Sequence, residues 1–129
     1  MAVGDGMSAN NTTSETTRAI GQRGEDEAAR FIEQRGLTIP TRNFHCRGGE
    51  IDLVCRDGKT LVFVEVRLRG KASHGGAAAS ITATKQGRII LAAQHYLARH
   101  NGFDADCRFD CVLIDGQGIE WIRDAFSAD

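Results

Sequence analysis

Hydrophobic positions recur along this chain with two periods, one typical of helices and one typical of strands. A period near 3.6 predicts a helix over residues 17–35, begun by a threonine N-cap and ended by Gly36. The same period predicts a second helix over residues 82–100, which the Asn101-Gly102 pair ends. The apolar stripes are Ile20, Gly24, Ala28, Phe31 and Ile32 in the first helix and Ile89, Ala93, Tyr96 and Leu97 in the second. Each helix is therefore expected to pack one face against a sheet.

Apolar segments of strand length fill most of the remaining sequence. Residues 37–46 predict a first strand, whose beginning lies at a sheet edge because it contains Pro40. Residues 49–69 predict a hairpin, residues 107–115 another strand, and residues 119–126 a short terminal element. The order of one helix, three strands, a second helix and a further strand predicts a mixed α/β domain with the hairpin at its centre.

The hairpin carries carboxylates where buried strands usually carry apolar side chains. The Asp57-Gly58 pair is typical of a two-residue turn, and this turn would place Glu50 opposite Glu65 and Asp52 opposite Phe63. Side chains alternate along a strand, so the three acids are expected on one face. The other face is expected to carry Ile51, Leu53, Cys55, Val62, Val64, Val66 and Leu68. Like charges placed opposite each other destabilise a sheet, so a positive group, most simply a divalent cation, is expected between the acids.

Length and composition are those of one globular domain. The chain has 129 residues, of which 41% are hydrophobic and 26% charged, and no apolar run approaches the roughly 20 residues of a membrane helix. Residues 1–16 are polar and predict a disordered tail, which leaves a domain over residues 17–129. Residues 70–80 are rich in glycine and other small residues and predict a flexible loop beside the hairpin. Because no secretion signal is evident, the protein is expected in the cytoplasm, with no membrane association.

Four cysteines raise the question of a zinc site. Cys107 and Cys111 lie four residues apart in a predicted strand, which separates them by about 13 Å. That distance is too long for two ligands of one tetrahedral zinc ion. Reduced thiols that serve as small core residues are the better interpretation.

The net charge of −1 conceals a strong asymmetry along the chain. Residues 42–99 carry ten Lys or Arg and four Asp or Glu, a local charge of +6, whereas both flanking segments are acidic. Basic residues around an acidic pocket predict a surface that binds nucleic-acid phosphates, and a solvated basic surface without a ligand is the alternative. Lys85 and Gln86 lie in the first turn of the second helix, where the helix dipole attracts anions. The expected DNA contacts are Arg67, Arg69, Lys71, Lys85, Gln86 and Arg88.

Asp52, Glu65 and Arg67 form the spacing D-x12-E-x-R, which suits the chemistry of a divalent metal. Carboxylates on adjacent strands are hard oxygen ligands for Mg²⁺ or Mn²⁺, and water bound to such an ion can attack a phosphodiester. Glu25 borders the apolar stripe of the first helix and could hold a second metal ion or orient that water, although an edge glutamate is also an ordinary surface residue. The expected metal ligands are Asp52, Glu65, Glu25 and Glu50.

Several longer motifs follow one another in the chain: Gly21-x-x-Gly24-Glu25, Arg42-Asn43, GEIDLV, VFVEVRLR, GGAAASITATKQ and CRFDCV…IEWIRDAF. Over residues 18–126 the chain thereby resembles the YraN-like family of uncharacterised bacterial proteins. The resemblance implies a restriction-endonuclease-like fold, similar to archaeal Holliday-junction resolvases, with a helix glutamate, a strand aspartate and an E-x-K motif. Carried over by motif, Glu25 matches the helix glutamate, Asp52 the aspartate and Glu65 the glutamate of E-x-K.

Arg67 departs from this pattern, because it stands where the resemblance implies lysine. Arginine stays charged in proteins and cannot act as a base, but it can clamp a phosphate through two parallel hydrogen bonds. Glu50 occupies a place where the endonucleases usually have proline. The resemblance therefore implies intact metal ligands beside an altered lysine position.

Residues and resemblance together predict a cytoplasmic, restriction-endonuclease-like α/β protein that binds DNA at branched or otherwise structured sites. The expected reaction is phosphodiester hydrolysis with Mg²⁺ or Mn²⁺, in which Asp52 and Glu65 bind metal, Glu25 assists and Arg67 stabilises the phosphate. The alternative is a non-catalytic adaptor for DNA or protein that kept the nuclease fold. The sequence leaves the oligomeric state open, with a homodimer among the alternatives.

Overall fold

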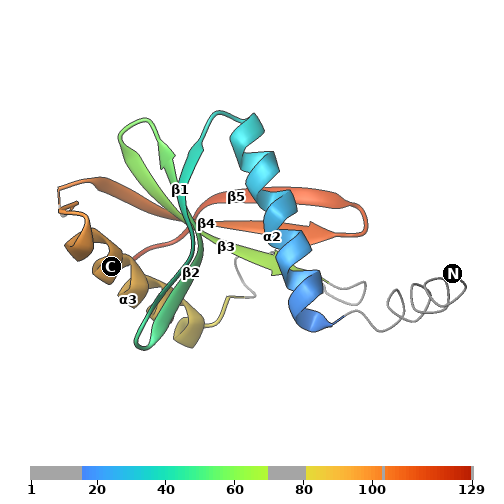
Figure 1. Cartoon of the computed structure of the whole chain (residues 1–129), viewed down its shortest axis with the longest axis horizontal. Coiled ribbons are helices and arrows are strands. Elements are labelled where there is room, and N and C mark those ends of the chain that lie inside the picture. The colour runs from blue at the N-terminus through green and yellow to red at the C-terminus, as the bar shows by residue number, and fades with distance from the viewer. Residues whose placement is uncertain (1–15, 70–80, 103, 129) are drawn as a thin grey trace, which may run out of the picture.

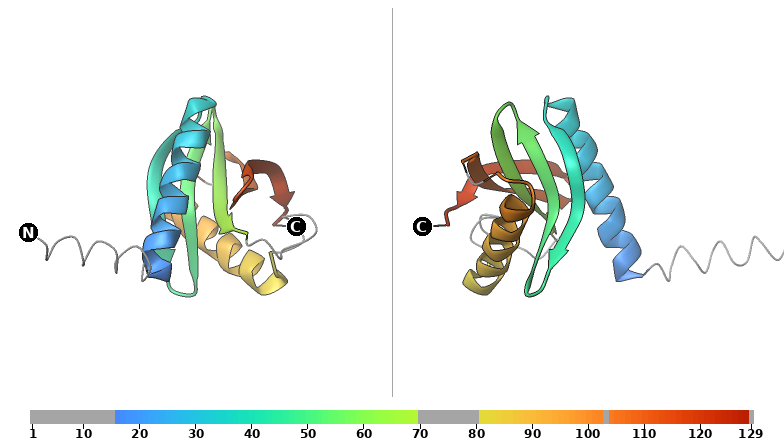
Figure 2. Two further views of the ribbon diagram at one scale, coloured as in Figure 1. Left: turned by 90° about the vertical axis from the view of Figure 1, so that its right-hand side faces the viewer. Right: turned by 60° about the vertical axis from the view of Figure 1, so that its left-hand side comes forward.

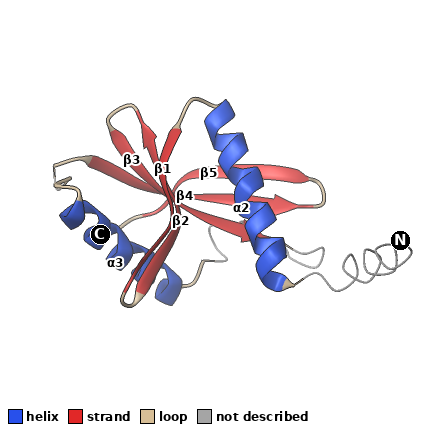
Figure 3. Ribbon diagram, in the orientation of Figure 1, coloured by secondary structure: helices blue, strands red, loops and turns tan. Residues whose placement is uncertain are grey.

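A computed structural model describes residues 16–69, 81–102 and 104–128 of the chain. The elements are α2 (Thr17–Gln34), β1 (Thr38–Cys46), β2 (Gly49–Asp57), β3 (Thr60–Leu68), α3 (Ala83–Arg99), β4 (Asp106–Asp115) and β5 (Gly118–Phe126). The five strands form one sheet in chain order, in which β3 and β4 run parallel and the other neighbouring strands antiparallel (Figures 1 and 3). The predicted mixed α/β class is confirmed, and the short terminal element is a full fifth strand.

Two segments predicted from the sequence lie outside the described residues: the tail before residue 16 and the loop at residues 70–80, which includes Lys71. Neither helix of the described chain is long and apolar enough to cross a membrane.

The helices cover opposite faces of the sheet (Figure 2). α2 packs Ala28 and Ile32 against the hairpin strands, in a cluster with Leu53, Val62 and Val64 among others. The second cluster, on the other face, lies under α3 and consists of Phe44, Ile51, Val54, Leu61, Phe63, Ile89, Ala92, Ala93, Tyr96 and Phe109. Ile20 was expected in the stripe of α2 but is 41% exposed in the first turn of the helix.

Threonine caps begin both helices, and the sequence predicts the first of them. The Thr16 hydroxyl accepts a hydrogen bond from the Ala19 N–H, and the Thr82 hydroxyl accepts one from the Lys85 N–H. α3 then returns the chain across the sheet, so that β4 can lie parallel to β3. This crossover places the first turn of α3 beside the C-terminal half of β3.

The hairpin register differs from the prediction by two residues. Asp57 pairs with Thr60 and Leu53 with Val64, so the turn is Gly58-Lys59 rather than Asp57-Gly58. Gly58 has a φ of +61°, which favours glycine at this first position of the turn. A shift of two preserves which residues share a face, but it moves Asp52 from the level of Phe63 to the level of Glu65.

The alternation of side chains is interrupted where Asn43 of β1 lies beside β2. Asn43 adopts a φ of +53°, and the pairs on either side of it, Arg42–Leu53 and Phe44–Ile51, stay in register. Ile51 packs in the α3 cluster, not with Leu53 on the α2 face as the sequence suggested. Leu68 was also expected on the buried face, but it is 45% exposed at the end of β3.

The cysteines are free thiols, as predicted. Cys55 and Cys111 are buried and serve as small core residues, and burial raises the pKa of each thiol to about 12. Cys107 is an exception to the expected core role, because it is exposed near the start of β4.

Asp110 is a fully buried carboxylate that holds β4 and β5 together. It accepts hydrogen bonds from the Arg108 guanidinium at 3.0 Å, the Trp121 indole N–H at 2.9 Å and the Asp124 backbone N–H at 2.9 Å. The β4–β5 register shifts at this point, and Asp124 has a φ of +53°. A carboxylate with this many donors tolerates burial, so Asp110 fixes the irregular part of the pairing.

We predict that Asp110→Ala lowers the free energy of unfolding by about 3–5 kcal/mol, because it leaves the Trp121 N–H without its acceptor and the Arg108 guanidinium with Asp57 as its remaining carboxylate partner. Denaturant titration measures this effect. Glu120→Ala, which removes an exposed acid from the neighbouring strand, is the control and should stay within about 0.5 kcal/mol of the parent. Equal stability of the two variants would contradict the role given to Asp110.

Candidate functional site

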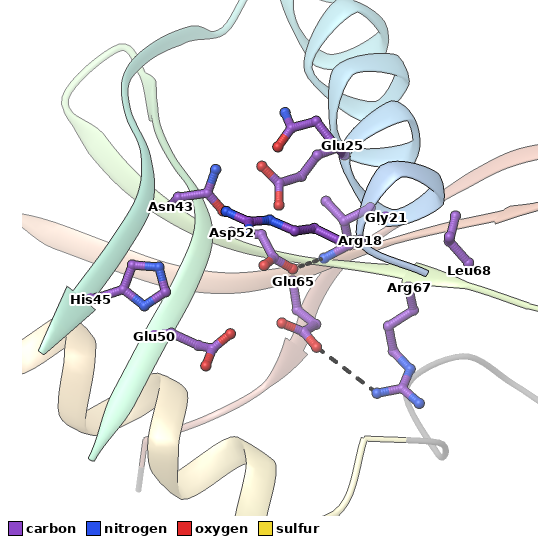
Figure 4. A pocket seen from close by; sticks show the side chains of 12 residues that line it. Arg18, Gly21, Glu25, Asn43, His45, Glu50, Asp52, Glu65, Arg67 and Leu68 are labelled. Atoms are coloured by element: carbon purple, nitrogen blue, oxygen red, sulfur yellow. Dashed lines mark hydrogen bonds and ion pairs between the residues drawn. The ribbon is translucent and has the colours of Figure 1, made fainter. Parts of the chain in front are cut away.

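A cavity of about 790 Å³ is lined by residues of α2, β1, β2 and β3 (Figure 4). The five residues of the predicted metal and catalytic sets all line it: Glu25, Glu50, Asp52, Glu65 and Arg67. They come from one helix and two strands and are separated by up to 42 positions in sequence. The predicted residues therefore meet in one place.

The pairing of β2 with β3 ends just before this cavity. Leu53–Val64 is the last pair of the ladder, and beyond it the Asp52 carboxylate accepts a hydrogen bond from the Val66 N–H at 2.8 Å. A side chain thus replaces the backbone acceptor that a continuing strand would supply. Where the strands separate, Asp52 and Glu65 lie side by side in the wall of the cavity (Figure 4).

Glu65 is the most deeply buried acid of the cavity. Its side chain is 6% exposed, and among the described residues its Oε1 atom has no hydrogen-bond partner. Burial, followed by the charge of Asp52, raises the pKa of Glu65 to about 8, whereas Lys85 and Arg67 act in the opposite direction. A buried carboxylate with an unsatisfied oxygen is costly unless a positive group binds it.

Asp52 and Glu25 have raised pKa values as well. Burial is the main cause for Asp52, opposed by the hydrogen bond from Val66 and by the Lys85 charge. Burial and the Asp52 charge raise the pKa of Glu25, while Asn43 and Arg42 lower it. Three acids that share one cavity therefore all resist ionisation, which is frequent at functional sites.

Cations surround these acids on the α3 side and at the rim. The Lys85 ammonium lies 3.7 Å from Glu65 Oε2, and an Arg67 guanidinium nitrogen lies 3.9 Å from the same oxygen. One turn along α3, an Arg88 nitrogen lies 3.4 Å from Glu50 Oε1. Three of the predicted DNA contacts are thus paired with the acids of the cavity.

The remaining predicted DNA contacts lie elsewhere or have structural partners. Arg69 forms an ion pair with Asp115 at 2.8 Å, beside β4 and away from the cavity. Gln86 donates a hydrogen bond to the Ile81 carbonyl at 3.0 Å and so fastens the start of α3. The structure does not bring either residue into the cavity.

Sequence reasoning missed two residues of β1 that shape the site. Asn43 lines the cavity and acts on Glu25, and its positive φ, which asparagine tolerates, turns the strand at this point. Arg42 lies 3.6 Å from Glu25 and also binds Asp26 of α2. The Arg42-Asn43 motif was visible in the sequence, but its distance from Glu25 along the chain concealed the contact.

The residues present suit a divalent cation held by two carboxylates. Within residues 16–69, 81–102 and 104–128, no three Asp, Glu, His or Cys side chains converge on one point, so the predicted four-ligand set is not assembled. Mg²⁺ commonly takes one or two protein carboxylates and completes its shell with water and substrate phosphates. Asp52 and Glu65 meet that requirement, and the unpartnered Glu65 oxygen provides an acceptor for the ion.

Comparison with known proteins identifies the family. The family model described as "Uncharacterised protein family UPF0102" matches residues 24–114. A UPF0102 protein of Dechloromonas aromatica is 64% identical over 115 residues, which cover 89% of this chain and 94% of the relative. One of Aeromonas hydrophila is 54% identical over 82% and 83% of the two chains, and the UPF0102 protein YraN of Escherichia coli is 52% identical over 87% of each. The chain belongs to the UPF0102 family, and the resemblance found in its motifs is confirmed.

We predict that the metal-free protein loses stability as the pH rises from about 4.5 to about 8. The folded state keeps the Glu65 proton up to about pH 8, whereas an unfolded glutamate releases it near pH 4.5. The unfolded state therefore gains stability relative to the folded state across this interval. Glu65→Gln removes the Glu65 contribution to this effect and should raise the free energy of unfolding at pH 8.5 by roughly 2–4 kcal/mol.

Urea denaturation at several pH values, with chelator present, measures this gain. Glu50→Gln is the matched control, because Glu50 lines the same cavity but is 36% exposed. Its unfolding free energy should follow the parent at every pH. Parallel pH profiles for Glu65→Gln and the parent would show that Glu65 titrates normally.

Proposed function

We propose that this member of the UPF0102 family is a DNA-binding, metal-dependent phosphodiesterase with a restriction-endonuclease-like fold. The observation that supports it best is the buried pair of Asp52 and Glu65, one oxygen of which lacks a hydrogen-bond partner among the described residues. A protein gains no stability from burying two acids side by side. Their placement makes sense as a site for a cation that the folded protein takes up.

The architecture is compatible with the proposed fold. The order of α2, the β1–β2–β3 meander, the crossover helix α3 and the parallel strand β4 supplies a glutamate from a helix and two acids from adjacent strands. That arrangement agrees with the motif order implied by the resemblance. The coarser class, a mixed sheet covered on both faces, is what the structure itself establishes.

Phosphodiester chemistry is the activity that this site suits best. A Mg²⁺ or Mn²⁺ ion bound by Asp52 and Glu65 would supply an activated water and polarise the phosphate. Glu25 faces the same cavity with a raised pKa, so it can hold or accept a proton near that water. Arg67 lies at the rim, 35% exposed, where it can contact a phosphate oxygen of the DNA backbone.

The surrounding charge favours a polyanionic substrate. Residues 42–99 carry a net +6, and Arg67, Lys85 and Arg88 lie within 4 Å of acids of the cavity. A metal ion that binds these acids would release the cations toward a phosphate backbone. The rival function is a DNA-binding adaptor without catalysis, and metal binding separates the two, since an adaptor requires no ion.

We predict that the parent protein binds Mn²⁺ and that Asp52→Asn and Glu65→Gln each weaken this binding at least about 10-fold. Both substitutions remove one negative charge and keep the side-chain shape, and the amide oxygen that replaces the Asp52 carboxylate can still accept from the Val66 N–H. Isothermal titration calorimetry gives the affinities. Glu50→Gln is the control and should remain close to the parent. Unchanged binding in Asp52→Asn would place the metal elsewhere.

We predict that DNA binding weakens steeply with salt and that branched DNA is cut when Mn²⁺ is present. Neutralising about four phosphates lowers the affinity on the order of 100-fold between 50 and 200 mM salt. Fluorescence anisotropy in Ca²⁺ measures binding, and gel assays with branched, flapped and linear DNA in Mn²⁺ measure cleavage. Asp52→Ala should bind DNA without cutting it. Metal binding and salt-dependent DNA binding without cleavage by the parent would favour the adaptor.

A further inference from the structure

We propose that Lys85, in the first turn of α3, supplies the fixed positive charge that contacts the reacting phosphate, and that Arg67 acts only at the rim of the site. This inference rests on the function proposed above and names a further catalytic residue for it. From the sequence, Lys85 is expected to make a general contact with DNA, and Arg67 is expected to stabilise the reacting phosphate. The structure assigns the two roles differently.

Lys85 contacts the more deeply buried acid of the pair. Its ammonium lies 3.7 Å from Glu65 Oε2, and its side chain is 28% exposed. Arg67 lies at a similar distance from that oxygen, but it is more exposed and follows Glu65 on the same strand. Lys85 is therefore the more central of the two cations.

The backbone around Lys85 is held firmly over Glu65. The Thr82 hydroxyl accepts from the Lys85 N–H at 3.1 Å, and the neighbouring Gln86 side chain donates to the Ile81 carbonyl at 3.0 Å. Ile81 is 3% exposed and packs against Cys111, which lies level with Glu65 in the parallel β3–β4 pair. The lysine and the glutamate are thus positioned by one packed unit, as a preorganised site requires.

The helix itself gives no reason for a lysine at this position. The N-terminal end of a helix dipole is positive, so a cation in the first turn is unfavourable there, and the first turn of α3 holds no acid to offset it. Side chains of a helix tilt toward its N-terminus, which directs Lys85 toward the end of β3. What favours the lysine is the acid pair outside the helix.

The chemistry needs Lys85 only as a charged group. When a water oxygen adds to phosphorus, the bond between phosphorus and one ester oxygen breaks, the water loses a proton and the leaving oxygen takes one up. Negative charge collects on the phosphate oxygens during this step. An ammonium held beside Glu65 can donate a hydrogen bond to one of these oxygens, and the step requires no proton from it.

The test compares three substitutions that each remove one positive charge: Lys85→Met, Arg67→Met and Lys59→Met. Lys59 lies in the exposed β2–β3 turn and is the control for net charge. Single-turnover cleavage of branched DNA in Mn²⁺, DNA affinity in Ca²⁺ and Mn²⁺ affinity are measured for each. If Lys85→Met does not fold, Lys85→Gln takes its place.

We expect Lys85→Met to lower the cleavage rate on the order of 100-fold, because the charge that stabilises the phosphate oxygens is lost. Mn²⁺ binding should not weaken, because the substitution removes a cation that competes with the metal for the acids. Arg67→Met should lower the DNA affinity and change the rate less than about 10-fold, and Lys59→Met should resemble the parent. A Lys85→Met rate equal to that of the control, or an Arg67→Met rate as low as that of Lys85→Met, overturns the inference while leaving the proposed function intact.

A parent that binds Mn²⁺ and DNA but never cuts would refute the hydrolysis instead. In that case the DNA affinities test the role of Lys85. A loss of DNA affinity of at least about 10-fold in Lys85→Met, larger than the loss in Arg67→Met, supports contact between Lys85 and the phosphate. Equal losses of DNA affinity in the two variants overturn the role given to Lys85. A parent that binds no form of DNA refutes both proposals together.

Discussion

The separation of β2 from β3 at Asp52 is the constraint on which the rest of this structure depends. Up to the Leu53–Val64 pair the strands form an ordinary antiparallel ladder, and beyond it the Asp52 carboxylate takes the place of a backbone acceptor for the Val66 N–H. The separation admits α2 and the turned strand β1 to the same cavity. Asp52 and Glu65 both line this cavity, and the buried Glu65 oxygen lacks a hydrogen-bond partner among the described residues.

Compensation for the buried acids comes from parts of the chain that are distant in sequence. Lys85 from α3 lies against Glu65, and Arg42 from β1 lies against Glu25. Gly49 permits a further contact of this kind, because a Cβ atom there would lie 2.3 Å from the Arg88 carbonyl oxygen. The close contact of β2 with α3 brings Glu50 to the Arg88 side chain. The pairing remains incomplete, since the pKa values of Glu25, Asp52 and Glu65 are all raised.

Two buried carboxylates in this protein illustrate opposite uses of charge. Asp110 receives hydrogen bonds from a guanidinium, an indole and a backbone N–H, and it fixes the irregular pairing of β4 with β5. Glu65 receives two cations at longer distance, and one of its oxygens has no partner among the described residues. The first arrangement is complete and stabilises the fold, while the second leaves a place for a ligand. Burial alone does not distinguish these two carboxylates, whereas the number of hydrogen-bond donors around each of them does.

The sequence by itself determined the elements and the residues of the site. Hydrophobic periods located both helices, and a threonine cap and Gly36 marked the ends of the first. Alternation grouped Glu50, Asp52 and Glu65, and all three line the cavity although the register differs by two residues. Only the tertiary structure decided that Asp52 lies level with Glu65, that Asn43 turns β1, and that Lys85 of α3 lies against Glu65. Local sequence patterns indicate which side chains are buried. The position of the turn, the end of a ladder and the docking of α3 depend on contacts between residues far apart in the chain, and no local pattern encodes them.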